Sequence, residues 1–347
     1  MISFVLCLHN RTFALLNYKM MNQEEKDILL KARSYRSVLA AGIRLYTSNF
    51  RKFFKASWLT ALLYSLVGGA ASTLMTLKIP AIFVAIMLQI QKYHGIFIEP
   101  LLHYAWTIFA IMWFFIAAFA VLALAHGTIM NQLKEHQETG SISIPTSWFK
   151  PSVKLMGRTL KGLFFTGFIF IGLYILEIAL LAALEAIKPG IIMQAPFTVF
   201  GCITIVNTLM SLLALPLFYV LPKYVLNNDK GYWSTLASSY GCGIRHWGSL
   251  FLVFFVSILL IAIVGLVIIL PANILYIANY MAQMGQLYGD PLGMPSYMTP
   301  MTYITYVLCN FIEFYALLLL LLHSYYAYGS IEAKEQERKQ QKLDILS

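Results

Sequence analysis

The chain has 347 residues, of which 59% are apolar and 12% are charged, and its formal net charge is +10. Soluble domains carry about 25% charged residues, so this composition excludes an ordinary soluble protein. A basic chain can be a nucleic-acid-binding protein, but no nucleic-acid-reading motif is present here, and we expect no nucleic-acid partner.

The first part of the chain, residues 1–35, is expected to be a cytoplasmic segment. Its residues 1–19 are apolar but are interrupted by His-Asn-Arg at 9–11, so they are too short to span a membrane, and they lack a small-residue cleavage site. Met20 and Met21 follow, and a polar run comes after them. We predict that translation starts at one of these methionines and that 1–19 is a mis-assigned extension. The alternative is an interfacial segment.

Six long apolar runs fill most of the remaining chain and predict an all-α, polytopic membrane helical bundle. A bilayer core needs roughly 20 helical residues to be crossed, and each run is long enough. The membrane domain is expected over 36–329, followed by a charged cytoplasmic tail at 330–347. The predicted spans lie at about 56–78, 101–128, 162–187, 195–221, 249–276 and 302–329.

The six spans pair into three two-helix units, each preceded by an amphipathic stretch. The stretches 36–54 and 233–251 align without gaps, with Ser37 opposite Ser234 and Phe54 opposite Phe251; 147–165 is a weaker match. Such stretches are typical of helices that lie in the membrane interface and contact lipids. The predicted headgroup contacts are Arg36, Arg44, Arg51, Lys52 and Lys55. The simpler alternative is that these helices only anchor the spans.

The distribution of basic residues predicts the orientation. Of the 25 Lys and Arg residues, 22 fall on one side of the predicted spans, and only Lys78, Lys92 and Lys188 fall on the other. Basic residues accumulate on the cytoplasmic side. Both termini are therefore expected in the cytoplasm, in a multi-pass protein of the cell (inner) membrane.

Polar residues inside the spans form a candidate intramembrane centre. An ionisable residue at mid-membrane costs at least about 2.5–3.5 kcal/mol, so each needs a reason. Glu177 and Glu313 are expected at similar depth. Asn310 shares a helical face with Glu313, and Asn207 lies in a polar stripe of the fourth span. The functional interpretation is a proton- or substrate-linked centre; the alternative is ordinary hydrogen bonding between helices.

No catalytic, cofactor or metal site is predicted. The four cysteines, Cys7, Cys202, Cys242 and Cys309, have no paired spacing, so neither a disulfide framework nor a zinc site is indicated. His126 and His323 lie near the same ends of two spans, and two isolated histidines do not specify a metal site.

One segment carries a family resemblance. Residues 216–255 read PLFYVLPKYVLNNDKGYWSTLASSYGCGIRHWGSLFLVFF: a Pro-interrupted span, a polar turn, an amphipathic helix and a new span. This arrangement resembles a broad group of six-span bacterial proteins that includes the membrane domain of some glycerophosphodiester phosphodiesterases and related domains of unknown function. The resemblance covers the layout of about 36–329 and implies no shared chemistry. The soluble phosphodiesterase domain has no counterpart here, so no catalytic residue is carried over.

These observations favour a non-enzymatic membrane interaction or organising subunit. Its partners would be membrane lipids and a protein bound through the cytoplasmic helices or the tail. The alternative is a small-solute or lipid transporter that uses the layer of Glu177 and Glu313. A membrane enzyme is the weakest alternative, because no Ser/His/Asp set or histidine cluster is present.

Overall fold

The computed structural model describes residues 29–93, 102, 104–142, 153–187, 196–227, 230–289 and 295–346. Within these ranges the regular structure is entirely α-helical, which confirms the predicted all-α class. The expectation about residues 1–19 falls outside the described residues.

In the described part of the chain, six helices are long and apolar enough to cross a membrane, which indicates a multi-pass membrane protein. Most are longer than the apolar runs, because the amphipathic and charged flanks are helical too. The long helices are α2 (Tyr35–Tyr93), α4 (Ala105–Thr139), α5 (Val153–Ile187), α7 (Pro196–Ala214), α10 (Trp247–Leu287) and α11 (Met298–Leu346). Two shorter helices, α8 (Leu217–Leu226) and α9 (Tyr232–Arg245), lie between α7 and α10.

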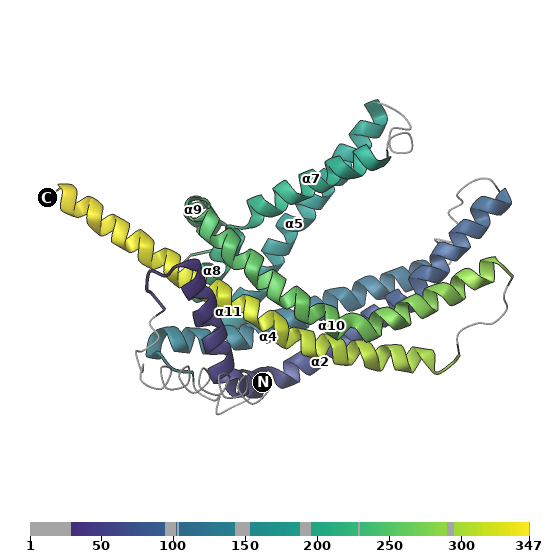
Figure 1. Cartoon of the computed structure of the whole chain (residues 1–347), viewed down its shortest axis with the longest axis horizontal. Coiled ribbons are helices and arrows are strands. Elements are labelled where there is room, and N and C mark those ends of the chain that lie inside the picture. Colours follow the sequence, from purple (N-terminus) through teal and green to yellow (C-terminus); the bar gives the residue numbers. More distant parts are fainter. Residues whose placement is uncertain are drawn as a thin grey trace, which may run out of the picture.

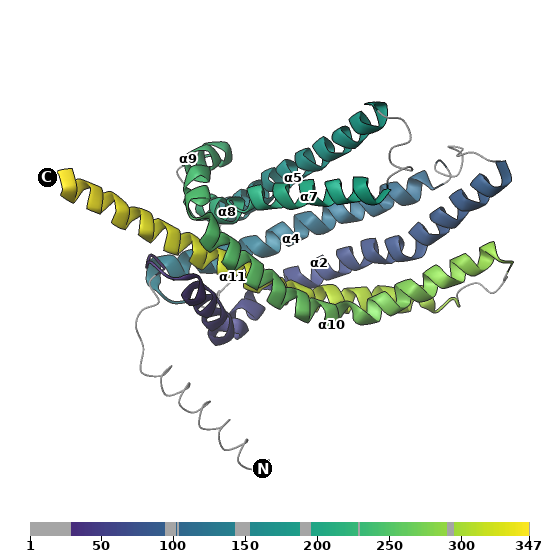
Figure 2. The same cartoon turned by 45° about the horizontal axis from the view of Figure 1, so that its top comes forward.

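The helices form a four-membered bundle with a separate pair beside it. Helices α2, α4, α10 and α11 lie side by side, whereas α5 and α7 rise away from them (Figure 1). The ends of α2, α5 and α10 that lead into the three hairpin connections point toward one end of the molecule in both views (Figure 2). This arrangement agrees with three antiparallel two-helix units.

The packed core lies toward the opposite end, where the helices converge. Its largest fully buried side chains include Phe53 of α2, Ile129 of α4, Tyr219 of α8 and Tyr325 of α11. Toward the hairpin ends the helices diverge, and most side chains of α5 and α7 are exposed. The core therefore fixes one end of the molecule and leaves the α5–α7 pair accessible toward its hairpin end.

Close approach of α2 and α11 depends on a small residue. A Cβ atom at Gly69 would lie 2.7 Å from Val307 Cγ2 and 3.2 Å from the Val307 backbone nitrogen. Ser65, one turn earlier, is buried and donates a hydrogen bond to the Ala61 carbonyl. Gly69 therefore permits the close packing of α2 against α11.

The amphipathic stretches differ between the first and third units. In the first, residues 36–54 belong to the unbroken helix α2, whose purple start is turned away from the rest of the helix (Figure 1). In the third, α9 ends at Arg245, and His246 separates it from α10. The two stretches align in sequence but do not have the same helix boundaries.

Pro216 interrupts the predicted fourth span. Because proline has no N–H, it leaves the carbonyl of the residue four positions earlier without its helical partner. Helix α7 ends at Ala214, and the indole N–H of Trp247 donates to the Leu212 carbonyl at 2.9 Å. The Tyr240 hydroxyl donates to the Leu213 carbonyl at 2.7 Å. The third unit thus supplies donors to the break, whereas α10 continues through its own Pro271.

Candidate functional site

Two of the predicted intramembrane polar residues meet between α5 and α7. Asn207 donates its side-chain N–H to Glu177 Oε1 at 2.7 Å. Glu177 lies ten residues before the end of α5, and Asn207 lies eleven residues after the start of α7. Proline at the first position of α7 suits a helix start, because its missing N–H would have no helical partner there. The hydrogen bond therefore joins two antiparallel helices well inside their apolar length.

This pair lines an open cleft of about 380 Å³, and all of its lining residues in the described part of the chain belong to α5 and α7. Ser211 of α7 adds a hydroxyl to the same surface, one turn after Asn207. The remaining lining residues are mostly apolar: Phe170, Ile171, Leu173, Tyr174, Val206 and Met210. The cleft therefore combines an apolar rim with a small polar centre, as binding sites in apolar surroundings commonly do.

The polar centre is unevenly covered. Glu177 is 8% exposed, whereas Asn207 and Ser211 are exposed and Tyr174 at the rim is 63% exposed. Exposed apolar side chains are normal on a membrane-facing surface, because lipid tails are equally apolar. Exposed amide and hydroxyl groups are not, because hydrocarbon offers them no hydrogen-bond partners. The centre of the cleft is therefore poorly suited to contact with lipid tails.

The other two predicted residues of the polar centre lie elsewhere. Asn310 and Glu313 are on α11, which packs against α2. The side-chain nitrogen of Asn310 lies 3.1 Å from the point where a Cβ of Gly68 would stand. Glu313 is partly buried and is not among the residues that line the α5–α7 cleft. The structure brings Glu177 and Asn207 together and places Glu313 and Asn310 in a different helix packing.

The predicted headgroup cations all lie on α2. Arg36, Arg44, Arg51 and Lys55 have exposed side chains, as contact with lipid headgroups requires. Lys52 is partly buried and donates to the Ile142 carbonyl at 2.6 Å, beyond the end of α4. Lys52 thus also connects α2 to the residues that follow α4.

The two histidines singled out in the sequence have separate partners. His323 is buried, and its Nδ1 lies 2.7 Å from Ser257 Oγ of α10. His126 Nδ1 lies 2.8 Å from the Leu122 carbonyl of its own helix. The bond of His126 stays within α4, and the bond of His323 joins α11 to α10; both suit a packing role.

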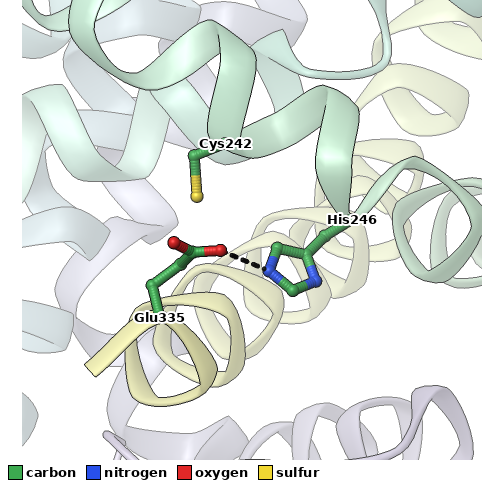
Figure 3. A group of neighbouring side chains, drawn as sticks. All are labelled: Cys242, His246 and Glu335. Atoms are coloured by element: carbon green, nitrogen blue, oxygen red, sulfur yellow. Dashed lines mark hydrogen bonds and ion pairs between the residues drawn. The ribbon is translucent and has the colours of Figure 1, made fainter. Parts of the chain in front are cut away.

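A second polar cluster, which the sequence did not indicate, lies where α9 meets α11. Cys242 and His246 stand one helical turn apart, and Glu335 reaches them from α11 (Figure 3). His246 Nε2 lies 3.0 Å from Glu335 Oε1. Their i, i+4 spacing places the cysteine and the histidine on one face, and this C-x-x-x-H pattern was the available signal. The carboxylate comes from a position 89 residues later, which no local pattern reveals.

Ion pairs surround this cluster. Arg245 donates to both oxygens of Glu335, at 3.1 and 2.9 Å. Nearby, Lys223 of α8 lies 2.6 Å from Glu332, which also accepts a hydrogen bond from the Tyr219 hydroxyl. Burial raises the pKa of the Cys242 thiol above its ordinary value. These contacts join α8, α9 and α11 at the core end of the molecule.

No protein-family model, curated protein sequence or solved structure matches the chain.

Proposed function

We propose that the chain is a non-enzymatic, multi-pass protein of the cell (inner) membrane that binds a transmembrane helix of a partner protein through the α5–α7 cleft. The observation that carries the proposal is the polar centre of Glu177, Asn207 and Ser211 in an open cleft on an otherwise apolar helix pair. A partner helix with one polar side chain would satisfy these groups and cover the apolar rim.

The packing of the molecule supports this assignment. Helix α5 is held mainly by α4 and α8, whereas α7 has few neighbours besides α5. In membranes, helices associate through close packing and hydrogen bonds. The hydrophobic effect does not drive their association, because lipid tails are as apolar as the helix surfaces. The α5–α7 pair has the surface for such association, because the other described helices do not cover its outer face (Figures 1 and 2).

The proposed orientation has both termini in the cytoplasm. It rests on the basic residues, 22 of 25 of which lie on the side that carries the amphipathic helices and the tail. On that side, the exposed cations Arg36, Arg44, Arg51 and Lys55 would bind anionic headgroups. The tail continues α11 to Leu346 and offers a second, cytoplasmic surface to a protein partner.

The transport alternative requires one cavity that contains both intramembrane carboxylates. Among the described residues, the cleft at Glu177 is lined by α5 and α7, and Glu313 is not part of it. No specific observation therefore favours transport over helix binding.

Site-specific photocrosslinking in native membranes tests the proposal. A photoreactive amino acid is placed at Tyr174, which is 63% exposed on the cleft rim, or at Ile263, which is 57% exposed on α10. The proposal expects one dominant protein adduct from position 174, absent from position 263 and reduced at least several-fold by Asn207→Leu. Lipid adducts alone at both positions, or the same protein adducts at both, would contradict it.

A further inference from the structure

The cluster of Cys242, His246 and Glu335 has the donor set of a transition-metal site. Each residue offers one ligand atom, and the three atoms all lie within 4.8 Å of one another. The thiol and the imidazole project from the same side of the α9 end, and the carboxylate faces them from α11 (Figure 3). One sulfur, one nitrogen and one oxygen donor thus face the same point.

The spacing suits a small tetrahedral cation. Zinc binds sulfur at about 2.3 Å and nitrogen or oxygen at about 2.0–2.2 Å, so neighbouring ligand atoms are separated by about 3.3–3.8 Å. The His246–Glu335 pair is already at 3.0 Å, and the other separations are at most 4.8 Å. Small side-chain rotations therefore bring all three donors to bonding distance. A fourth position remains for water.

The chemistry of the donors favours Zn²⁺ and related d-block ions over Ca²⁺ or Mg²⁺. Thiolate and imidazole are preferred ligands of zinc, whereas the hard cations take oxygen ligands almost exclusively. One carboxylate oxygen is not enough for a calcium or magnesium site. In the ion-pair alternative, Glu335 only neutralises Arg245 and His246, while Cys242 packs against the core and hydrogen-bonds to Tyr219. The metal site would instead use all three donors together.

Arg245 does not exclude a cation. Its guanidinium lies 2.9 Å from Oε2 and 3.1 Å from Oε1 of Glu335, and Arg338 lies 3.8 Å from Oε1, so a cation would share this carboxylate with two guanidinium groups. A metal-bound carboxylate commonly keeps an outer hydrogen-bond partner that orients it, and Arg245 stands in that place on Oε2. Lys223 and Glu332 form their own pair beside the cluster and so add little net charge to it.

We propose that Cys242, His246 and Glu335 bind one divalent d-block cation of the zinc class. The cation fastens α9, the amphipathic helix of the third unit, to the start of the charged tail on α11. None of its three residues lines the α5–α7 cleft, and it does not depend on the proposed partner binding.

The test is a Co²⁺ titration of the full-length, chelator-treated protein in lipid nanodiscs. Cobalt bound by a thiolate gives a near-ultraviolet sulfur-to-metal charge-transfer band. We expect this band to saturate at one ion per chain and to disappear when Zn²⁺ is added, but not when Mg²⁺ is added. Cys242→Ser should abolish the band, and His246→Ala and Glu335→Gln should each weaken binding about 100-fold or more. Cys202→Ser, which changes an exposed cysteine of α7, should leave it unchanged.

A second measurement on the unmodified sequence keeps the proposal testable if a variant does not fold. Zn²⁺ should slow the alkylation of Cys242 at least tenfold while the alkylation of Cys202 stays constant, with each cysteine followed on its own peptide. The chelator should restore the original rate. Absence of the charge-transfer band in the wild-type protein, or equal alkylation of Cys242 with and without Zn²⁺, would overturn the proposal.

Discussion

The indole N–H of Trp247 donates to the carbonyl of Leu212 at 2.9 Å, across two segments that are not consecutive helices. Pro216 cannot donate to this carbonyl, so the side chain of α10 replaces the missing backbone donor. An unsatisfied backbone group is expensive in a membrane, where no water is available. The break between α7 and α8 is thus stabilised by the unit that follows it.

Removing this donor should destabilise the protein. We expect Trp247→Phe to lower the free energy of unfolding by about 1–2 kcal/mol, because it leaves the Leu212 carbonyl without its strongest partner. The measurement is denaturant unfolding in mixed micelles. Phe251→Leu, which removes the ring stacked on Trp247, reports the packing contribution separately. Equal stability of Trp247→Phe and wild type would show that the hydrogen bond is not significant.

The approach of α2 to α11 predicts a contrast between two glycines. Gly69→Ala would place its methyl group 2.7 Å from Val307 Cγ2 and should destabilise the bundle by about 1–3 kcal/mol. Gly167→Ala in α5 meets no atom within 4 Å and should be neutral or slightly stabilising, because alanine favours a helix. Thermal unfolding in nanodiscs measures both. Similar melting temperatures for the two variants would contradict the packing described for α2 and α11.

Arg158 attaches α5 to the end of α8. Its guanidinium donates to the carbonyls of Tyr224 at 2.6 Å, Asn227 at 2.7 Å and Lys230 at 3.0 Å, and it lies 4.2 Å from the Tyr224 ring centroid. Carbonyls at a helix end attract a cation. Arg158 is therefore one of the contacts that position α5 against α8.

We expect Arg158→Met to destabilise the protein by about 2 kcal/mol and Arg158→Lys to recover only part of the loss, because lysine lacks the planar fork. Lys161→Met, at an exposed position one turn later, is the matched control and should have little effect. Spin labels on α4 and α5 would show a broader distance distribution in Arg158→Met. An unchanged distribution would mean that other contacts set the position of α5.

Metal binding should depend on pH. Burial raises the pKa of the Cys242 thiol, so the cation must displace a proton from the sulfur at neutral pH. Affinity should therefore fall as pH falls, by about tenfold per pH unit for each proton displaced. Zn²⁺ titrations between pH 6 and about 8 by competition with a chromophoric chelator measure this slope. An affinity independent of pH would exclude the thiolate as a ligand.

The sequence predicted the helices far better than the contacts between them. The apolar runs identified the six crossing helices because a bilayer imposes a minimum length, and Pro216 indicated the interruption of the fourth. The amphipathic stretch 36–54 has no such breaker and continues into α2, whereas its counterpart is divided at His246. Periodicity places residues on a face but does not reveal whether a helix continues.

Depth along a span does not determine lateral neighbours. Glu177 and Glu313 were expected at a similar depth, yet the carboxylate of Glu177 pairs with Asn207 and lies in a cleft that Glu313 does not line. The contact of Cys242 and His246 with Glu335 likewise depends on which helices are lateral neighbours. The path of α11 past α9 is set by packing of the whole core, which a single sequence does not encode in any local pattern.

The most direct test of the proposed partner-binding cleft is native mass spectrometry of the protein extracted from its own membrane in lipid nanodiscs. Ser211→Trp fills the cleft from within, and Ile263→Trp adds the same bulk on α10, away from the cleft. The proposal predicts one partner protein bound at a fixed ratio to the wild type and to Ile263→Trp, and its loss from Ser211→Trp. A wild-type chain without a protein partner, or a partner that survives Ser211→Trp, would contradict it.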